Sequence, residues 1–222
     1  MPKGFTLIEM LVSVAIFSVV MVIALGALLS ISVSDRKAES LKSVINNLNF
    51  SLDSMSRALR TGTNWGCDVN RTLIPSAQTD CSGGANEIMF TSSSGVVTYY
   101  RLESLTDDNS NAASMCGQTS PNVGCIVRST DGGATWSPVT APEVIITDYS
   151  GTVTPSYLFY LVGSKQGGVS SPEPAQPKLV IMVSGYVKVG GGASSQAACN
   201  TPGNQCSVFH FQTTVTQRLY DQ

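Results

Sequence analysis

The sequence predicts an α+β fold in which a long N-terminal helix is followed by an antiparallel β-sheet domain. Three observations lead to this prediction. Residues 5–33 contain a single ionisable side chain, that of Glu9. Residues 41–59 repeat apolar side chains at the spacing of one helical face, and residues 62–222 hold short runs of β-forming residues separated by turn residues. We expect the second half of the helix to pack on the sheet, because that half combines an apolar face with a polar one.

The apolar segment at residues 5–33 is long enough to cross a membrane as a helix. At 1.5 Å per residue it exceeds the roughly 30 Å thickness of the hydrocarbon layer. A secretory signal peptide does not fit, because its apolar run is shorter and Glu9 stands at the start of this one. A plain membrane anchor remains open at this stage, although it gives no reason for Gly4, Phe5 or Glu9.

Residues 34–61 are predicted to continue this helix with a single apolar face. The residues of that face are Leu41, Ile45, Leu48, Leu52, Met55 and Leu59. Their steps of three and four positions are those of one side of a helix. No proline interrupts residues 5–60 and Gly62 supplies a stop signal, so we expect one helix of about 56 residues, roughly 84 Å long. Gly26 lies in the apolar half, where it weakens the helix by up to ~1 kcal/mol relative to alanine but also permits close helix packing.

Residues 62–222 are predicted to form a β-rich globular domain with long polar loops. The expected strands lie at residues 87–91, 96–103, 124–129, 144–148, 157–162, 178–189 and 207–219. Short runs of this kind, separated by turn residues, are typical of an antiparallel, hairpin-rich sheet.

The cysteines occur as three pairs that are close in sequence: Cys67 and Cys81, Cys116 and Cys125, Cys199 and Cys206. Their spacing does not match a zinc finger or ribbon, and we expect no metal site. Paired cysteines beyond a membrane segment are typical of an oxidised, extracytoplasmic domain. Six cysteines allow 15 pairings. Disulfides between nearest neighbours are the expected arrangement, and free buried thiols are the alternative.

Catalysis and nucleic-acid binding are not expected. The formal net charge is −2 and no basic stripe is visible, so a phosphate backbone would find few partners. The single histidine, His210, lies in an alternating run and no nucleophile elbow is present. Asp107 and Asp131 lie in sequences that turn chemistry explains without bound calcium. We therefore expect neither an enzyme nor a cofactor.

The segment Gly4-Phe5-Thr6-Leu7-Ile8-Glu9 closely resembles the processing signature of the type IV pilin family, which includes pilins, pseudopilins and competence pilins. The resemblance implies the pilin fold, with the helix as a stem. It also implies a leader at residues 1–4 that prepilin peptidase removes by cleavage between Gly4 and Phe5, followed by N-methylation of Phe5. The resulting division is residues 1–4, 5–33 as membrane or filament-core segment, 34–61 as amphipathic helix, and 62–222 as globular domain.

Three residues of the stem, Phe5, Glu9 and Gly26, are implied in assembly by the same resemblance. Glu9 corresponds to the family's acidic residue at the fifth position of the processed chain. A carboxylate in a bilayer costs several kcal/mol and is usually paired or functional. We hypothesise that Glu9 meets the N-terminal amine of a neighbouring subunit, whereas in the simpler alternative it extends to the membrane interface. In the family, a helix breaker near Gly26 marks where the stem melts on assembly.

The C-terminal run Phe211-Gln-Thr-Thr-Val-Thr-Gln-Arg218 resembles the last strand of PilW-type minor pilins and of J-type minor pseudopilins of type II secretion. The resemblance implies a structural subunit of a type IV pilus-like filament, a minor pilin that acts in filament initiation or at the tip. The alternatives are a J-type pseudopilin, a tip adhesin or DNA-uptake pilin, and a membrane-anchored β protein without a filament. An exposed aromatic or basic patch on the loops would favour an adhesin, and the sequence offers Trp65 and Trp136 there but little positive charge.

The implied partners are other pilin or pseudopilin subunits, prepilin peptidase and the inner-membrane assembly platform, with membrane lipid as the surrounding before assembly. The implied location is the inner membrane, crossed once with the globular domain outside the cytoplasm, and then the pilus or pseudopilus.

Overall fold

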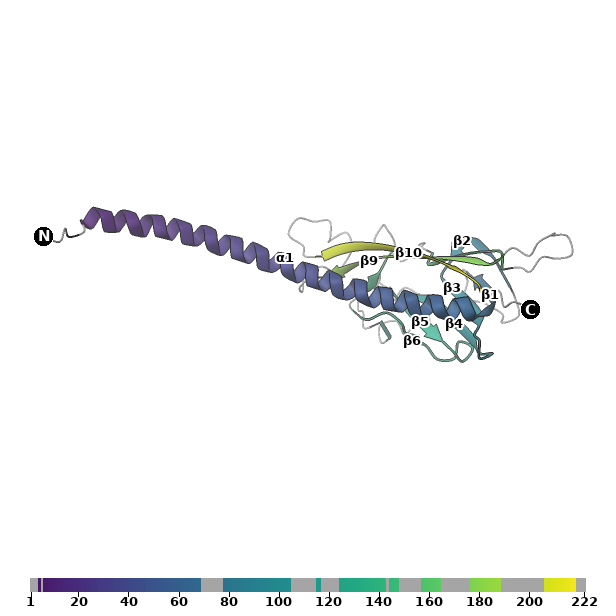
Figure 1. Cartoon of the computed structure of the whole chain (residues 1–222). Coiled ribbons are helices and arrows are strands. Elements are labelled where there is room, and N and C mark those ends of the chain that lie inside the picture. Colours follow the sequence, from purple (N-terminus) through teal and green to yellow (C-terminus); the bar gives the residue numbers. More distant parts are fainter. Residues whose placement is uncertain are drawn as a thin grey trace.

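The computed structural model describes residues 4, 6–68, 78–104, 115–116, 124–142, 144–147, 157–164, 176–188 and 206–218. One long helix projects from a β-sheet domain, and the N-terminus lies at its free end (Figure 1). The α+β fold predicted from the sequence is confirmed.

Helix α1 spans Leu7–Thr61 and has 55 residues, which corresponds to roughly 82 Å. It begins after Thr6, whose backbone is extended, and Glu9 in the first turn complements the positive end of the helix dipole. It ends where Gly62 becomes extended and donates its N–H to the carbonyl of Leu59 at 3.0 Å. The helix passes Gly26 without a break.

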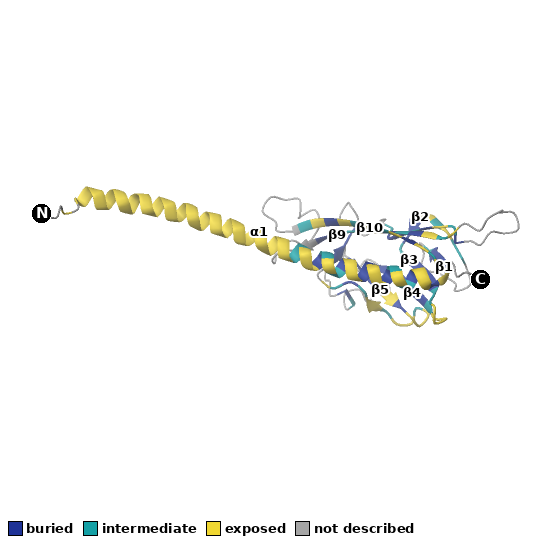
Figure 2. Ribbon diagram, viewed as in Figure 1, coloured by how far each residue is buried: buried dark blue, intermediate teal, exposed yellow. Residues whose placement is uncertain are grey.

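The two halves of α1 have opposite environments (Figure 2). All residues from 7 to 39 are exposed. The buried residues of the second half are Val44, Leu48, Ser51, Leu52, Met55 and Leu59. The predicted apolar face is therefore the face that packs on the sheet, with Leu41 and Ile45 half-buried at its start.

The strands are β1 (Thr63–Asp68), β2 (Cys81–Ala85), β3 (Glu87–Thr91), β4 (Val97–Ser104), β5 (Gly124–Ser129), β6 (Ser137–Pro138), β7 (Ile145–Ile146), β8 (Phe159–Val162), β9 (Lys178–Lys188) and β10 (Cys206–Thr216). They form one sheet in the order β1-β3-β4-β5-β7-β9-β8-β2, to which β6 is added beside β5 and β10 beside β9. The pairings among these described strands are antiparallel.

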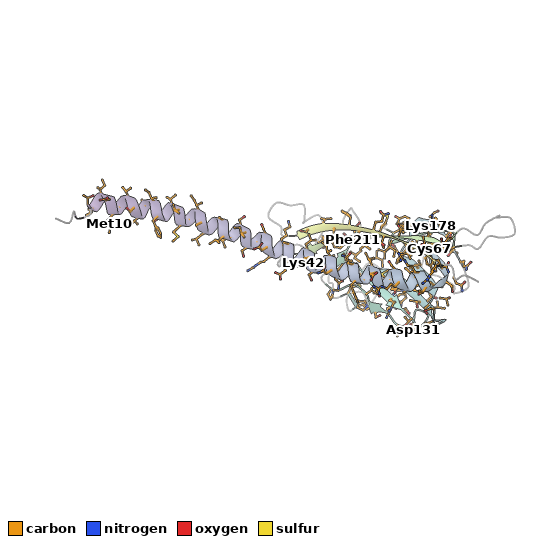
Figure 3. All side chains as sticks on the ribbon, viewed as in Figure 1. Met10, Lys42, Cys67, Asp131, Lys178 and Phe211 are labelled. Carbon is orange, nitrogen blue, oxygen red and sulfur yellow. A yellow bond between two sulfur atoms is a disulfide. The ribbon has the colours of Figure 1, made fainter. Side chains whose placement is uncertain are left out.

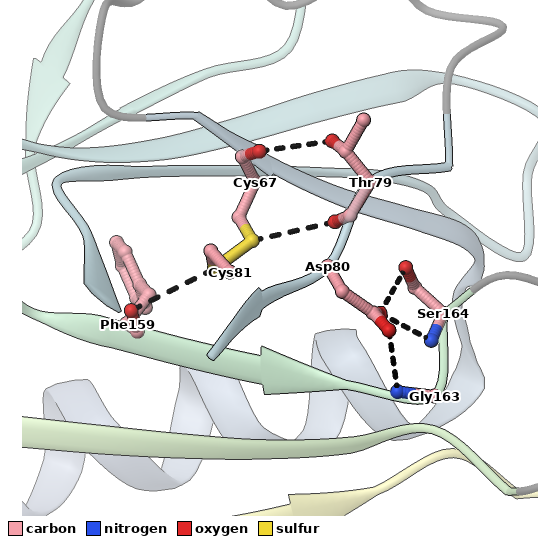
Figure 4. The surroundings of a disulfide bond; sticks show 7 residues. All are labelled: Cys67, Thr79, Asp80, Cys81, Phe159, Gly163 and Ser164. Atoms are coloured by element: carbon pink, nitrogen blue, oxygen red, sulfur yellow. Dashed lines mark hydrogen bonds between the residues drawn. A yellow bond between two sulfur atoms is a disulfide. The ribbon is translucent and has the colours of Figure 1, made fainter. Parts of the chain in front are cut away.

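The two ends of the main strand order are tied together at a seam between β1 and β2. A disulfide joins Cys67 of β1 to Cys81 of β2, with their Cα atoms 6.0 Å apart (Figure 4). Cys67 also exchanges two hydrogen bonds with Thr79: its N–H donates to the Thr79 carbonyl at 3.2 Å, and the Thr79 hydroxyl donates to its carbonyl at 2.9 Å. The seam thus keeps the first and last strands of the order in contact.

The core lies between the second half of α1 and the sheet. Its largest fully buried side chains include Trp65, Tyr100, Phe90, Phe159 and Leu48. Two polar contacts fasten α1 to the segment that follows β6: Ser51 donates to the Val139 carbonyl at 2.9 Å, and the Asn47 side chain accepts from the Ala141 N–H at 3.1 Å. Burial and these bonds together hold the helix in one orientation on the sheet.

A second, smaller cluster covers the opposite face of β4 and β5. It contains the disulfide between Cys116 and Cys125, whose Cα atoms are 5.6 Å apart, together with Val127 and Trp136. The guanidinium of Arg101 lies 3.7 Å from the centre of the Trp136 ring, a cation–π contact. The face of the sheet away from α1 therefore also carries a small buried apolar cluster.

Each predicted strand overlaps a strand of the structure, but β1, β2 and β6 were not predicted. β1 contains Asn64 at φ 55° and an irregular register against β3, and β2 contains Gly84 at φ 98°. Neither has the alternation of apolar and polar residues by which a half-buried strand is recognised. Their pairing depends on partners that are distant in sequence, and β6 is only two residues long.

Candidate assembly surface

The first half of α1 is an apolar surface that the rest of the chain does not cover. Its large exposed side chains include Leu7 at 78%, Val22 at 71% and Leu29 at 69% of full exposure. By length and composition this helix can cross a membrane, with a mean hydropathy of 2.8 in its most apolar window and none of that window buried. Figure 3 shows side chains projecting all around this half, with Met10 near its free end.

The polar groups of this segment differ in how they are satisfied. The hydroxyl of Ser13 donates to the carbonyl of Glu9 at 2.7 Å, and that of Ser18 donates to Val14 at 2.8 Å. These bonds let a serine enter an apolar medium at low cost. The carboxylate of Glu9 is the charged group of the segment, and no described residue of the chain pairs with it. A partner for Glu9 must come from outside the described part of the chain.

Two glycines of the predicted site are not required by packing within this chain. A Cβ added at Gly4 or at Gly26 would meet no atom within 4 Å. By contrast, a Cβ at Gly185 would collide with the carbonyl of Ile145, so that glycine is needed for packing. Packing among the described residues therefore gives no reason for a glycine at position 4 or 26. Phe5 and residues 1–3 fall outside the described residues.

The predicted disulfides lie in the globular domain, far along the chain from the assembly residues of the stem. Two of the three predicted pairs, Cys67–Cys81 and Cys116–Cys125, are formed. Beside the first, the Asp80 carboxylate accepts hydrogen bonds from the N–H groups of Gly163 and Ser164 at 3.1 and 2.7 Å (Figure 4). These contacts fix the end of β8 to the start of β2. The third predicted pair lies outside the described residues: Cys199 entirely, and Cys206 in its side chain.

His210 and Asp131, considered from the sequence for catalysis and for calcium binding, make ordinary hydrogen bonds within the domain. His210 is exposed on β10, with its Nδ1 3.0 Å from the hydroxyl of Ser184 on β9. Asp131 closes a turn: hydrogen bonds from the Thr135 hydroxyl and N–H, then from Ser129, lower its pKa to about 2. Within the described ranges no three His, Cys, Asp or Glu side chains gather as metal ligands, and Asp107 lies outside them.

A groove of about 320 Å³ separates the second half of α1 from β10. Its lining residues are Asn49, Leu52, Asp53, Ser56, Arg57, Arg60, Phe211, Gln212 and Thr213. An ion pair of 2.5 Å joins Asp53 to Arg57 on its helical wall. Sequence reasoning missed this feature, because nothing local in the sequence places β10 beside α1.

The predicted residues of the stem are therefore not drawn into one pocket. Gly4 and Glu9 lie at the free end of α1, Gly26 lies midway along its exposed half, and the disulfides lie in the domain. This arrangement is that of an extended surface for other helices or lipid, rather than a centre that converges on a small molecule.

Comparison with known proteins gives one match. Residues 2–25 match the family model of the prokaryotic N-terminal methylation motif. No curated protein and no solved structure matches the chain. The matched segment includes the predicted cleavage position and the first part of α1, and the helix it begins is long and apolar enough for a single-pass anchor. The motif and the fold together support a type IV pilin-like prepilin, a substrate of prepilin peptidase.

Proposed function

We propose that this protein is a minor structural subunit of a type IV pilus-like filament and acts in filament initiation or at the tip. Prepilin peptidase cleaves it between Gly4 and Phe5, and Phe5 is then N-methylated. The observation that carries the proposal is the division of α1: one continuous helix has a first half without cover and a second half with one face packed on a folded domain.

The uncovered half explains both the membrane stage and the filament stage. Burying a large apolar side chain is favourable by about 1.5–3 kcal/mol, and residues 7–33 carry such side chains on all sides of the helix. Before assembly, lipid covers them in the inner membrane. In the filament, the helices of neighbouring subunits replace the lipid. The same surface is thus satisfied in both states, and the assembly platform transfers the helix from one to the other.

Glu9 fixes the axial position of each subunit relative to its neighbour in the filament. In the filament core its carboxylate pairs with the N-terminal amine of an adjacent subunit, which cleavage after Gly4 creates. A pair of opposite charges attracts far more strongly in a medium of low dielectric constant than in water. Replacing Glu9 with Gln should reduce incorporation into filaments, while Asp35→Asn, beyond the apolar segment, should not. Unchanged incorporation of the Glu9→Gln protein would refute this role.

The globular domain faces outward and lies outside the cytoplasm. Disulfides persist in oxidising compartments and are rare in the cytosol, and two are formed in this domain. The domain therefore folds on the far side of the membrane from the cleaved leader. Its contacts with other subunits are made beside the helical core of the filament.

Within the family we assign the chain to the PilW-type minor pilins, with the J-type pseudopilin of type II secretion as the second candidate. The support is the C-terminal run that ends at Arg218: its strand, β10, pairs with β9 along its whole length. The length of the chain and its long loops also favour a minor subunit over a major one. Assembly into a surface pilus or into a periplasmic pseudopilus distinguishes the two candidates.

The surroundings of Trp65 and Trp136 give the adhesin alternative little support. Trp65 is 1% exposed and its indole N–H donates to the Gly62 carbonyl at 3.2 Å. Trp136 packs over Arg101 and edge-on to Tyr99. Trp65 is therefore a core residue, and the half-buried Trp136 has Arg101 over its ring, which leaves less of that ring for a sugar or a base to stack on.

Mass spectrometry of sheared surface filaments tests the proposal. We expect a peptide that begins at N-methylated Phe5, at low abundance beside a dominant pilin. If this peptide is the dominant species, the chain is a major subunit. If the processed chain is found in the membrane fraction and not in filaments, the pseudopilin takes its place. An intact leader in every fraction would refute the filament function and leave a membrane anchor.

A further inference from the structure

The backbone of β10 has one edge that faces α1. Within the described part of the chain β10 pairs only with β9, from Cys206 opposite Lys188 to Thr216 opposite Lys178. β9 in turn pairs with β7 and β8 on its other side. β10 is therefore an edge strand of 11 residues, about twice the usual strand length.

The hydrogen-bond alternation identifies which groups point to this edge. In an antiparallel pair, alternate residues direct their N–H and C=O groups to the partner and the residues between them direct theirs away. Gln217 donates to Pro177 at 3.3 Å, in register with β9, whereas Arg218 donates to the carbonyl of Arg60 in α1 at 3.0 Å. The backbone N–H and C=O groups of the even-numbered residues of β10 therefore point away from β9, towards the side on which Arg218 bonds to α1. No described backbone group bonds to those of Gln212, Thr214 and Thr216.

Of these three residues, Gln212 lines the groove of about 320 Å³ between β10 and α1, and Thr214 and Thr216 continue the same strand edge towards Arg218. β10 contributes Phe211, Gln212 and Thr213, and α1 contributes a polar row with two guanidinium groups and one carboxylate, those of Arg57, Arg60 and Asp53. The row has a net charge of +1. Near Arg60 the groove ends, because the bond from Arg218 ties strand and helix together.

The sequence of β10 lacks the devices that protect natural edge strands. Such edges usually carry lysine, proline or inward charges, are short, or are covered by a helix or loop; here α1 lies beside the edge and the groove separates the two. β10 reads Cys-Ser-Val-Phe-His-Phe-Gln-Thr-Thr-Val-Thr and contains no proline, lysine, arginine or carboxylate. A long edge of high β-propensity beside an open groove is a template for a further strand.

We infer that the groove between β10 and α1 is a docking slot for an extended segment of another filament subunit, one that carries a carboxylate. The segment pairs its backbone with the outward groups of Gln212, Thr214 and Thr216 and directs its acidic side chain to Arg60, because Arg57 already forms an ion pair with Asp53. The slot lies on α1 itself, in line with the uncovered apolar half that makes the helical contacts of assembly. This inference rests on the proposed filament function, and it adds a second, strand-mediated contact between subunits.

Residue-resolved amide exchange of the full-length protein tests the slot. In detergent, we expect the amides of Gln212, Thr214 and Thr216 to exchange rapidly, while those of Thr213 and Val215, bonded to β9, are slow. In sheared filaments the three outward amides should exchange at least tenfold more slowly. A peptide probe, acetyl-Thr-Val-Glu-Val-Thr-amide, should slow them in detergent, and the same peptide with lysine in place of glutamate should not.

Matched variants separate docking from folding. Thr214→Pro removes one outward N–H and leaves the β9 ladder intact, as proline is tolerated at outward positions of edge strands. Its melting temperature should stay near that of the wild type while its incorporation into filaments falls several-fold. Thr214→Ala keeps the N–H and should incorporate normally. Thr213→Pro removes a ladder bond and serves as the variant that does unfold the domain.

The other results would overturn the inference in distinguishable ways. Slow exchange of the three outward amides in dilute detergent means that a segment of the same chain covers the edge. Protection that grows with protein concentration in detergent means that a second copy covers it. Unchanged exchange in filaments, or normal incorporation of Thr214→Pro, shows that no strand docks there. Absence of the chain from filaments refutes the proposed function instead, and failure of the acidic peptide to bind refutes the slot independently.

Discussion

The division of α1 into an uncovered half and a buried half predicts opposite effects for one substitution made at two positions. Leu48 is fully buried between α1 and the sheet, whereas Leu25 is 58% exposed on the free half. Replacing either leucine with alanine removes the same atoms from the same helix. Leucine and alanine also have similar helix propensities. A difference in outcome therefore reports the surroundings of the side chain and not the helix itself.

The magnitude for Leu48→Ala follows from its burial. The transfer of about three carbon groups contributes roughly 2.4 kcal/mol at ~0.8 kcal/mol each. A cavity adds to this, so the loss of unfolding free energy should fall between about 2 and 5 kcal/mol. For a domain of this size, each kcal/mol lowers the melting temperature by about 2–4 °C. We expect a decrease of roughly 4–20 °C for Leu48→Ala and about none for Leu25→Ala.

Tryptophan fluorescence of the full-length protein in detergent is the suitable assay. Trp65 is buried in the core beside the end of α1, so its emission changes when the domain unfolds. It is insensitive to the first half of α1, which stays helical in the micelle. A decrease for Leu25→Ala as large as that for Leu48→Ala would refute the division of the helix. So would an unchanged melting temperature for Leu48→Ala.

Three further predictions concern the globular domain and the stem. Replacing both Cys67 and Cys81 with serine should destabilise the domain by about 2–4 kcal/mol, because the bridge closes a loop with a sequence separation of 14; an unchanged melting temperature of this double variant would contradict the prediction. Gly185→Ala should prevent correct pairing of β7 with β9, because its Cβ would overlap a backbone carbonyl, whereas Gly26→Ala should leave the melt of the domain unchanged; a normal melt for the first would contradict the packing. The pKa of Asp131 is lowered to about 2 by its turn hydrogen bonds. The ionised side chain therefore contributes fully to the stability of the folded domain above the unfolded pKa of about 4, and this contribution is lost as the pH falls towards about 2. The melting temperatures of the wild type and Asp131→Asn should therefore converge over that interval, and a constant difference down to pH 2 would contradict the assignment.

Several predictions from the sequence agree with the structure because they depend on neighbours along the chain. The limits of α1 follow from an unbroken run without proline that ends before Gly62, and its buried face follows from steps of three and four residues. The longer strands, β9 and β10, are recognisable by their β-forming residues. Disulfides between neighbouring cysteines require only short loops.

The predicted processing site can be recognised from the sequence and not from the structure of the monomer. Gly4 contacts nothing that a Cβ would disturb, and Glu9 finds no partner among the described residues. A fold alone would not single out either residue. The match to the N-terminal methylation motif at residues 2–25 covers both of them.

Other features were decided only by tertiary structure. Whether Trp65 is a surface aromatic or a core residue depends on α1 ending above it, since the local sequence Thr-Asn-Trp-Gly-Cys-Asp has no apolar period. The seam between β1 and β2, and the groove between β10 and α1, each join segments that lie far apart in the chain. A periodic pattern shows which side of an element is apolar, because that depends on residues three or four positions apart. It carries no information on which distant element will cover that side, because this choice is made by the packing of the whole domain.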